Sequence, residues 1–138
     1  MPLAPPTILL VDDDEPTRRI LRRWLAQLNL HAQVVEAEDG AQALAAVKAH
    51  CELSHEPRSL LVLLDLNMPV MDGLEFLEQQ VQLPAHCRQL MAVIVVSSTP
   101  DRAEQEKARG LAIDLRPKPL NIDQLRELVC NYLPDAVG

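Results

Sequence analysis

Three short stretches of the sequence are apolar at almost every position, and each has the length of a β-strand. They are Thr7 to Val11, Leu60 to Leu64 and Met91 to Val96. A strand with one face in water alternates apolar and polar residues, whereas a strand covered on both faces is apolar on consecutive residues. The three stretches therefore indicate a parallel sheet that lies between two layers of helices.

The sequence also predicts two further strands, with helical segments between the strands. The strands are expected at Gln33 to Glu36 and at Ala112 to Arg116. The clearest helical stripe consists of Ile20, Leu21, Trp24, Leu25 and Leu28. Strands that alternate with helices in this way form right-handed crossovers, and the functional site of such a sheet lies at the carboxyl ends of its strands.

Four expected helix starts carry the same capping pattern, in which an Asp or Asn is followed three residues later by Gln or Glu. The pairs are Asp39 with Gln42, Asp72 with Glu75, Asp101 with Glu104, and Asn121 with Gln124. The first residue of each pair is expected to be the N-cap of a helix. The repeated pattern supports the alternation of strands and helices.

The length of 138 residues and the hydrophobic content of 48% suit one domain with a single sizeable core. We expect a flexible N-terminus at residues 1–6, the folded domain at 7–134 and a short tail at 135–138. The net charge of −7 argues against nucleic-acid binding, because nucleic-acid binders gather Lys and Arg on one face. The cysteines show no Cys-x-x-Cys spacing, and no apolar run is long enough to span a membrane, so we expect a cytoplasmic protein with reduced cysteines.

Acidic residues directly follow two of the apolar strands. Asp12 and Asp13 come after the first strand, and Asp65 comes after the third. Because neighbouring parallel strands end at the same edge of a sheet, these carboxylates are expected close together, which is unfavourable unless a cation or protons neutralise them. Carboxylates that share a site with a phosphate suit Mg²⁺. Asp14 has another explanation, because it precedes Pro16 and fits a helix N-cap.

Two other strand ends offer groups that bind a phosphate. Ser97 follows Met91 to Val96 with a hydroxyl, and Lys118 follows the fifth strand with an ammonium group. By themselves these residues also fit a strand-end cap and a solvated charge. Together with the carboxylates, they make a site for a phosphoryl group and its metal ion.

These positions resemble the signature of response-regulator receiver domains. The matching segments are Val11-Asp12-Asp13, Asp65-Leu66-Asn67-Met68-Pro69-Val70-Met71-Asp72-Gly73, Ser97 and Lys118-Pro119, in that order and over nearly the whole chain. The resemblance implies an α/β, flavodoxin-like, doubly wound fold, with a five-stranded parallel sheet in the order 2-1-3-4-5 and five helices. Pro117 fits this order, because it has no N–H and the fifth strand would lie at an edge.

The resemblance also implies roles at the cluster of carboxylates. Asp65 would be the phosphoacceptor, and Asp12 and Asp13 would hold Mg²⁺ directly or through water. The backbone carbonyl of Asn67 would complete the protein ligands of the ion. The sequence therefore predicts a magnesium site that includes the residue to be phosphorylated.

The phosphoryl group itself would be bound by Ser97 and Lys118, with a cis peptide bond between Lys118 and Pro119. The family implies that the donor is a histidine kinase or a histidine phosphotransfer protein. The domain would catalyse phosphorylation and dephosphorylation of its own Asp65 only, so we expect a signalling switch and not an enzyme with a separate substrate.

A receiver of this kind signals through a surface that meets a downstream protein target. That surface is expected at the fourth helix (Asp101 to about Arg109), the fifth strand and the last helix. The fourth helix offers the core mainly Ala103, Ala108 and Leu111, so it is expected to be the most mobile helix. Leu115 stands where the family has an aromatic residue, which puts the family's aromatic rotamer switch in doubt. The sequence does not determine the oligomeric state, and a homodimer is one of the alternatives.

Two other classes of protein share parts of this pattern. Magnesium-dependent phosphatases of the haloacid dehalogenase type also use an Asp nucleophile in an α/β fold. They normally carry a second Asp two residues after the nucleophile, where this chain has Asn67. They also need a cap that covers the substrate, and this chain is too short to include one. An interaction module of the same fold that is never phosphorylated would have no need of the acidic residues.

Overall fold

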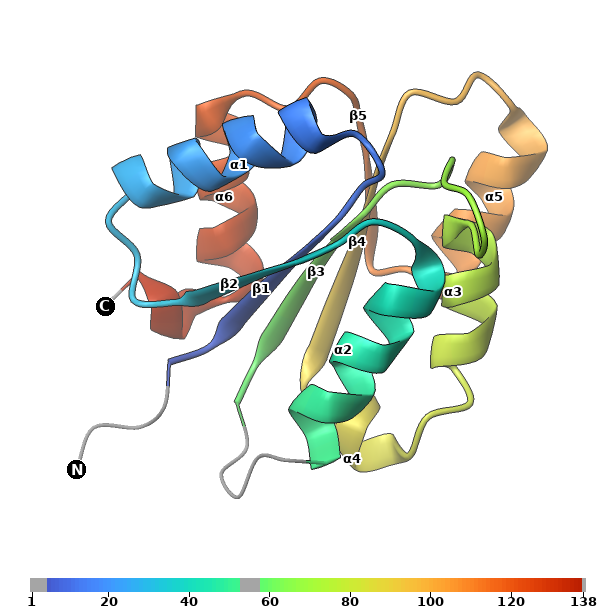
Figure 1. The fold of residues 1–138 in the computed structure, drawn as a ribbon, viewed down its shortest axis with the longest axis horizontal. Coiled ribbons are helices and arrows are strands. Elements are labelled where there is room, and N and C mark those ends of the chain that lie inside the picture. Colours follow the sequence, from blue (N-terminus) through green and yellow to red (C-terminus); the bar gives the residue numbers. More distant parts are fainter. Residues whose placement is uncertain (1–4, 53–57, 138) are drawn as a thin grey trace.

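The chain folds into three layers in the computed structural model, which describes residues 5–52 and 58–137 (Figure 1). A sheet of five strands lies in the middle, with helices on both faces. The strands are β1 (Thr7–Val11), β2 (Gln33–Ala37), β3 (Leu60–Leu64), β4 (Met91–Ser97) and β5 (Asp114–Pro117). The helices are α1 (Glu15–Gln27), α2 (Gly40–Glu52), α3 (Gly73–Gln80), α4 (Ala85–Arg88), α5 (Arg102–Leu111) and α6 (Ile122–Tyr132), followed by the 3-10 turn η1 (Pro134–Ala136).

The strand order is β2-β1-β3-β4-β5, which confirms the predicted order 2-1-3-4-5. All neighbouring strands are parallel. The β5 strand lies at an edge of the sheet, where a proline is tolerated because one side of the strand needs no hydrogen-bond donors; this fits Pro117. The register pairs Val11 of β1 with Leu64 of β3, so these two strands end side by side.

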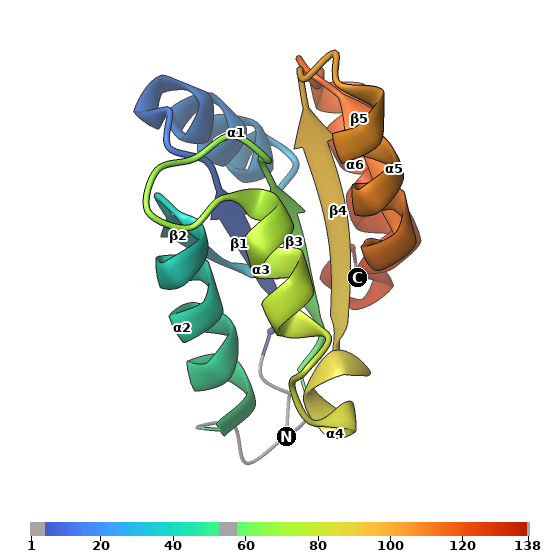
Figure 2. The same cartoon turned by 90° about the vertical axis from the view of Figure 1, so that its right-hand side faces the viewer.

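Two apolar cores lie on opposite faces of the sheet, because successive residues of a strand point to opposite faces. Leu9 and Val11 of β1 face the core under α2, α3 and α5, whereas Ile8 and Leu10 face the core under α1 and α6. Figure 2 shows α2 and α3 side by side on the first of these faces. Every residue of β1, β3 and β4 is buried, which confirms the two-sided burial predicted from their apolar sequences.

The four expected N-caps all form. Each accepts a hydrogen bond from the backbone N–H three residues later; they are Asp39, Asp72, Asp101 and Asn121. The capping box is reciprocal at Asp72 and Asn121. At the other two helix starts the side chain of the third helical residue has a different partner. Gln42 accepts a hydrogen bond from the Glu38 N–H, and Glu104 accepts one from the Thr99 hydroxyl.

The helix count and the bounds of β2, β4 and β5 differ from the sequence expectation. The β2 and β4 strands each extend one residue further, to Ala37 and Ser97, and β5 lies further along the chain than expected. The described residues form six α-helices instead of five, because the single turn α4 lies between α3 and β4. A four-residue helix is too short to show helical periodicity, and only its Cys87 is buried. The expected fourth helix is therefore α5. The β5 strand begins at Asp114 and not at Ala112, because the Ala112 N–H still bonds to the Ala108 carbonyl at the end of α5.

The α5 helix has little apolar contact with the rest of the protein. Ala108 is its buried residue, and Leu111 is half-buried. The expected contact of Ala103 with the core is wrong, since this residue is exposed. Five residues separate it from Ala108, a rotation of about 140° around a helix, so the two residues face different sides.

Both ends of the chain were assigned from sequence. Residues 1–4 and Gly138 lie outside the described residues, so the domain boundaries stay a prediction. Within the expected tail, Ala136 is buried in the core under α1 and α6, and its carbonyl accepts the His31 N–H at 2.8 Å. Within residues 5–52 and 58–137, none of the helices has the length and apolar character needed to cross a membrane.

Candidate functional site

Three carboxylates meet at the carboxyl end of the sheet. Asp12 and Asp65 follow the paired residues Val11 and Leu64, and the Asp65 N–H donates to the Val11 carbonyl at 2.9 Å. Carboxylate oxygens of Asp12, Asp13 and Asp65 all lie within 4.8 Å of one another. Asp12 and Asp65 are only 5% and 6% exposed, whereas Asp13 is exposed. The fold thus brings together the three acidic residues selected from the sequence.

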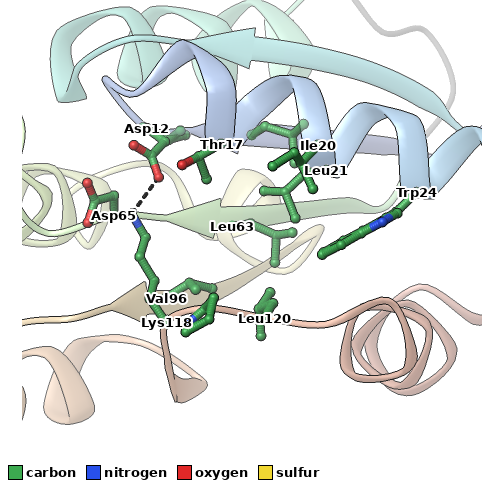
Figure 3. Close-up of a pocket in the computed structure, with 13 residues that line it drawn as sticks. Asp12, Thr17, Ile20, Leu21, Trp24, Leu63, Asp65, Val96, Lys118 and Leu120 are labelled. Atoms are coloured by element: carbon green, nitrogen blue, oxygen red, sulfur yellow. Dashed lines mark hydrogen bonds and ion pairs between the residues drawn. The ribbon is translucent and has the colours of Figure 1, made fainter.

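Lys118 reaches these carboxylates from the end of β5. Its Nζ lies 2.6 Å from Oδ2 of Asp12 and 3.5 Å from Oδ1 of Asp65 (Figure 3). The Lys118–Pro119 peptide bond is cis, as expected. The Lys118 N–H donates to the Ser97 carbonyl at 3.1 Å, which joins the ends of β4 and β5. One ammonium group therefore contacts two of the three carboxylates, Asp12 and Asp65.

The charges at this site are only partly balanced. Burial raises the pKa of Asp65; Lys118 lowers it, but the Asp12 charge adds to the effect of burial. Burial alone would lower the pKa of Lys118, but its hydrogen bond to Asp12 and the charges of both carboxylates outweigh burial and raise that pKa. The ionised site would therefore gain from a second cation.

The raised pKa of Asp65 predicts that Asp65→Asn stabilises the metal-free protein at pH 7. A carboxyl group whose folded-state pKa lies above its ordinary value of 3.8 favours folding most below that value, and this contribution is lost as the pH rises through the folded-state pKa. The amide does not titrate, so the variant avoids this loss. Thermal unfolding with a chelator present should show a higher midpoint for the variant at pH 7, and a difference that shrinks below about pH 3.8.

A matched exchange elsewhere is the control for this pH dependence. Asp39→Asn keeps an N-cap of the same shape on α2, where Asp39 accepts the Gln42 N–H at 2.8 Å. Its difference from wild type should not follow the pH profile of Asp65→Asn. If the wild-type protein became more stable relative to Asp65→Asn as the pH rises from 4 to 7, the raised pKa of Asp65 would be contradicted.

Ser97 and Asn67 lie at the same edge of the sheet. Ser97 is the buried last residue of β4, and its Oγ accepts the Thr99 N–H at 3.1 Å. Asn67 is exposed, and its backbone N–H bonds to the Asp65 carboxylate and lowers the pKa of that group. Their roles toward a phosphoryl group and a metal ion stay predictions.

An apolar cavity of about 160 Å³ adjoins the charged groups. Asp12, Asp65 and Lys118 lie at one end of it, and Trp24 of α1 lies at the other (Figure 3). The wall between them is mainly aliphatic; it includes Leu21, Leu63, Val96 and Leu120. Thr17 also lines the cavity, but its hydroxyl donates to Asp14. Among the described residues that line the cavity, Lys118 is therefore the group that compensates the charge of Asp12 and Asp65.

Arg18 is a residue near the site for which the motifs predicted no role. It is buried on α1, and its Nη1 donates to the backbone carbonyl of Asp12 at 2.6 Å. The sequence does contain a signal for it. Arg18 precedes Leu21 by three residues and Leu25 by seven, so a charged side chain occupies the apolar face of its helix.

Comparison with known proteins identifies similar sequences. A family model described as "Response regulator receiver domain" matches residues 8–130. The chain is 32% identical over 127 residues to sporulation initiation phosphotransferase F of Bacillus subtilis, a match that covers 92% of this chain and 93% of that protein. It is 33% identical over 97 residues to response regulator Rcp1 of Synechocystis sp., covering 70% of this chain and 66% of that one, so the match spans just under two thirds of that relative.

Solved structures of similar proteins share the fold. The phosphorylated cyanobacterial phytochrome response regulator RcpA matches with a TM-score of 0.78 and 28% identity, over 96% of this chain and 97% of that one. The Mn²⁺-bound form of response regulator Rcp1 matches with a TM-score of 0.73 and 26% identity, over 93% and 94% of the two chains. With the family match over residues 8–130 and the five-stranded order β2-β1-β3-β4-β5, the chain belongs to the receiver-domain family of two-component response regulators.

Proposed function

We propose that this receiver domain accepts a phosphoryl group on Asp65 from a phosphohistidine of a histidine kinase or a histidine phosphotransfer protein. The main support is the position of Asp65, whose carboxylate is buried among Asp12, Asp13 and Lys118 at the ends of neighbouring strands. A relative named as a phosphotransferase and a similar structure described as phosphorylated agree with this chemistry.

The donor set fits Mg²⁺ as the cofactor. Three carboxylates with oxygens within 4.8 Å of one another are hard ligands, and Lys118 alone leaves part of their charge uncompensated. Asp12, Asp13 and Asp65 would hold the ion, with the Asn67 carbonyl as the further ligand that the family implies. When bound, the ion would offset negative charge on the transferring group. The Mn²⁺-bound form of Rcp1 supports a divalent cation.

The residues of the chain would carry out the transfer by position and charge. An oxygen of Asp65 forms a bond to phosphorus while the bond from phosphorus to the donor nitrogen breaks, and the electron pair of that bond stays on the donor imidazole. Lys118 then pairs with the phosphoryl oxygens, and the Ser97 hydroxyl donates to one of them. Water later hydrolyses the acyl phosphate and restores the carboxylate, so the chain modifies only itself.

The proposed output surface consists of α5, β5 and α6, with α5 as the element that moves. Thr99 connects the site to this helix, since its N–H donates to Ser97 Oγ at 3.1 Å and its hydroxyl donates to Glu104 at 2.9 Å. A Ser97 side chain drawn toward the phosphoryl group would pull this loop with it. Leu115 replaces the aromatic residue of the family, so displacement of α5, and not rotation of an aromatic ring, would carry the signal.

The proposal is tested by labelling the protein with acetyl phosphate. With Mg²⁺ present we expect a mass gain of one phosphoryl group that is released by hydroxylamine and maps to Asp65. The same sample should show changed amide exchange in α5. With a chelator in place of Mg²⁺ the label should be lost, because the uncompensated carboxylates repel the anionic donor.

Two results would contradict the proposal. Labelling that proceeds equally well in chelator would exclude the metal-dependent mechanism. Catalytic hydrolysis of small phosphate esters, with no stable label, would favour the phosphatase class over a receiver switch.

A further inference from the structure

Arg18 is a buried cation directly behind the acidic site. Its residue exposure is 6%, and its guanidinium makes three contacts. Nη1 donates to the carbonyl oxygen of Asp12 at 2.6 Å, Nε donates to Glu36 at 2.9 Å, and Nη2 lies 3.7 Å from Glu38. A buried guanidinium is costly unless it is paired and hydrogen-bonded, and these contacts compensate for the burial of Arg18 beside the site.

Glu36 holds the guanidinium in its place. This residue lies on the edge strand β2, and its carboxylate bonds to both Arg18 and Arg22. Burial alone would raise the pKa of Glu36, but the hydrogen bonds from Arg22 and Arg18 outweigh it and lower that pKa. Glu36 therefore stays ionised at neutral pH, and it binds Arg18 through Nε while Nη1 bonds to Asp12.

The contact with Asp12 involves the peptide group that joins the two metal-site residues. The Asp12 carbonyl belongs to the planar Asp12–Asp13 peptide, so a hydrogen bond that holds this carbonyl limits rotation of the backbone that carries both carboxylates. The Asp12 side chain is held separately, since Oδ1 accepts the Asp14 N–H at 2.9 Å and Oδ2 accepts from Lys118 at 2.6 Å. Asp13 is exposed, and Arg18 constrains it through the orientation of this peptide.

We propose that Arg18 is a positioning residue for the cation site: its hydrogen bond to the Asp12 carbonyl holds the Asp12 and Asp13 carboxylates toward Asp65 so that all three bind one divalent ion. The inference rests on the proposed function, because it concerns the same metal site. Arg18 touches neither Asp65 nor the proposed ion; it acts through the backbone. Groups that orient metal ligands in this way typically change metal affinity about 10- to 100-fold.

Arg22 provides a matched control for the other explanation, in which Arg18 only fastens α1 to β2. Both arginines lie on α1 and both bond to Glu36. The contacts of Arg22 are with Glu36 and Glu15, whereas Arg18 also bonds to Asp12. A purely structural role therefore predicts that both substitutions lower stability and that neither changes metal binding.

The test measures the Mg²⁺ dissociation constant by titration calorimetry on Arg18→Met, Arg22→Met and the wild-type protein. Arg18→Met should bind Mg²⁺ about 10-fold more weakly or worse, and Arg22→Met should stay within about twofold of wild type. Arg18→Lys should restore part of the affinity, because an ammonium group can reach the carbonyl but lacks the fork that also binds Glu36. In the metal-free protein, the Asp13 and Asp14 amides should exchange faster in Arg18→Met only.

The outcomes separate this inference from the proposed function. A wild-type protein that binds no Mg²⁺ would overturn both. A wild type that binds Mg²⁺ and is labelled, with an unchanged constant in folded Arg18→Met, would overturn the role of Arg18 alone. If Arg18→Met does not fold, Arg18→Gln serves instead, because its shorter side chain stays polar but cannot reach the carbonyl; a wild-type constant there would equally overturn the inference.

Discussion

Asp65→Asn is expected to abolish labelling by acetyl phosphate while the protein stays folded. The amide has almost the shape of the carboxylate but lacks the anionic oxygen that would attack phosphorus in the proposed transfer. Removal of one buried negative charge also relieves repulsion with Asp12, so the variant should be at least as stable as wild type at pH 7. Loss of label therefore cannot be attributed to unfolding. Intact-protein mass spectrometry with Mg²⁺ present measures the effect directly.

The control for this loss is again Asp39→Asn, which makes the same chemical exchange at the N-cap of α2. It should be labelled at the wild-type rate, since Asp39 lies outside the cluster of three carboxylates found among the described residues. Retained labelling in Asp65→Asn would refute the assignment of the phosphoacceptor. Equal loss in both variants would show that the acidic composition, and not one residue, determines the reaction.

Gly73→Ala is expected to destabilise the protein by about 3 kcal/mol, because the new methyl group would collide with the backbone of the site. A Cβ at Gly73 would lie 2.4 Å from the Asp65 carbonyl oxygen and 2.7 Å from the Leu66 Cα. These atoms cannot easily move away, since the Gly73 N–H donates to the Leu66 carbonyl at 2.9 Å and Asp65 follows the buried strand β3. Urea unfolding measures the loss, and the labelling rate should fall with it.

Gly110→Ala is the matched control for this clash. Gly110 lies in α5, and a Cβ there would meet no atom within 4 Å. Alanine favours a helix over glycine, so this variant should gain roughly 0.5–1 kcal/mol. Gly73→Ala with wild-type stability would mean that α3 starts further from β3 than the structure places it.

Much of the fold was predictable because burial on both faces leaves a direct mark on a strand. The boundaries of β1 and β3 match the apolar stretches residue for residue. The sheet order came from the family resemblance and not from these stretches, since apolar residues do not specify which strands are neighbours. The sequence missed α4, whose single turn is shorter than the period that reveals a helix.

The sequence predicted the charged residues of the candidate site but not the residue that holds them in place. Asp12, Asp65 and Lys118 were selected because each directly follows a strand, and parallel strands end at one edge. The support from Arg18 was not found, because an arginine on an apolar helix face has no fixed partner in the sequence. Its partners are the carbonyl group of Asp12, which follows β1, and a carboxylate on the edge strand β2, and only the folded chain brings both within reach.

The sequence by itself determined the family, the class of fold and the chemical groups at the strand ends, because periodicity, capping and side-chain chemistry are properties of short segments. The tertiary structure alone decided the distances that make those groups one site. Lys118 lies 106 residues after Asp12 in the sequence, yet its Nζ is 2.6 Å from that carboxylate. Strand register determines such distances, burial in the fold raises the pKa of Asp65, and the packing of α1 brings Arg18 to the Asp12 backbone. These are properties of the whole packed chain, which no short segment contains.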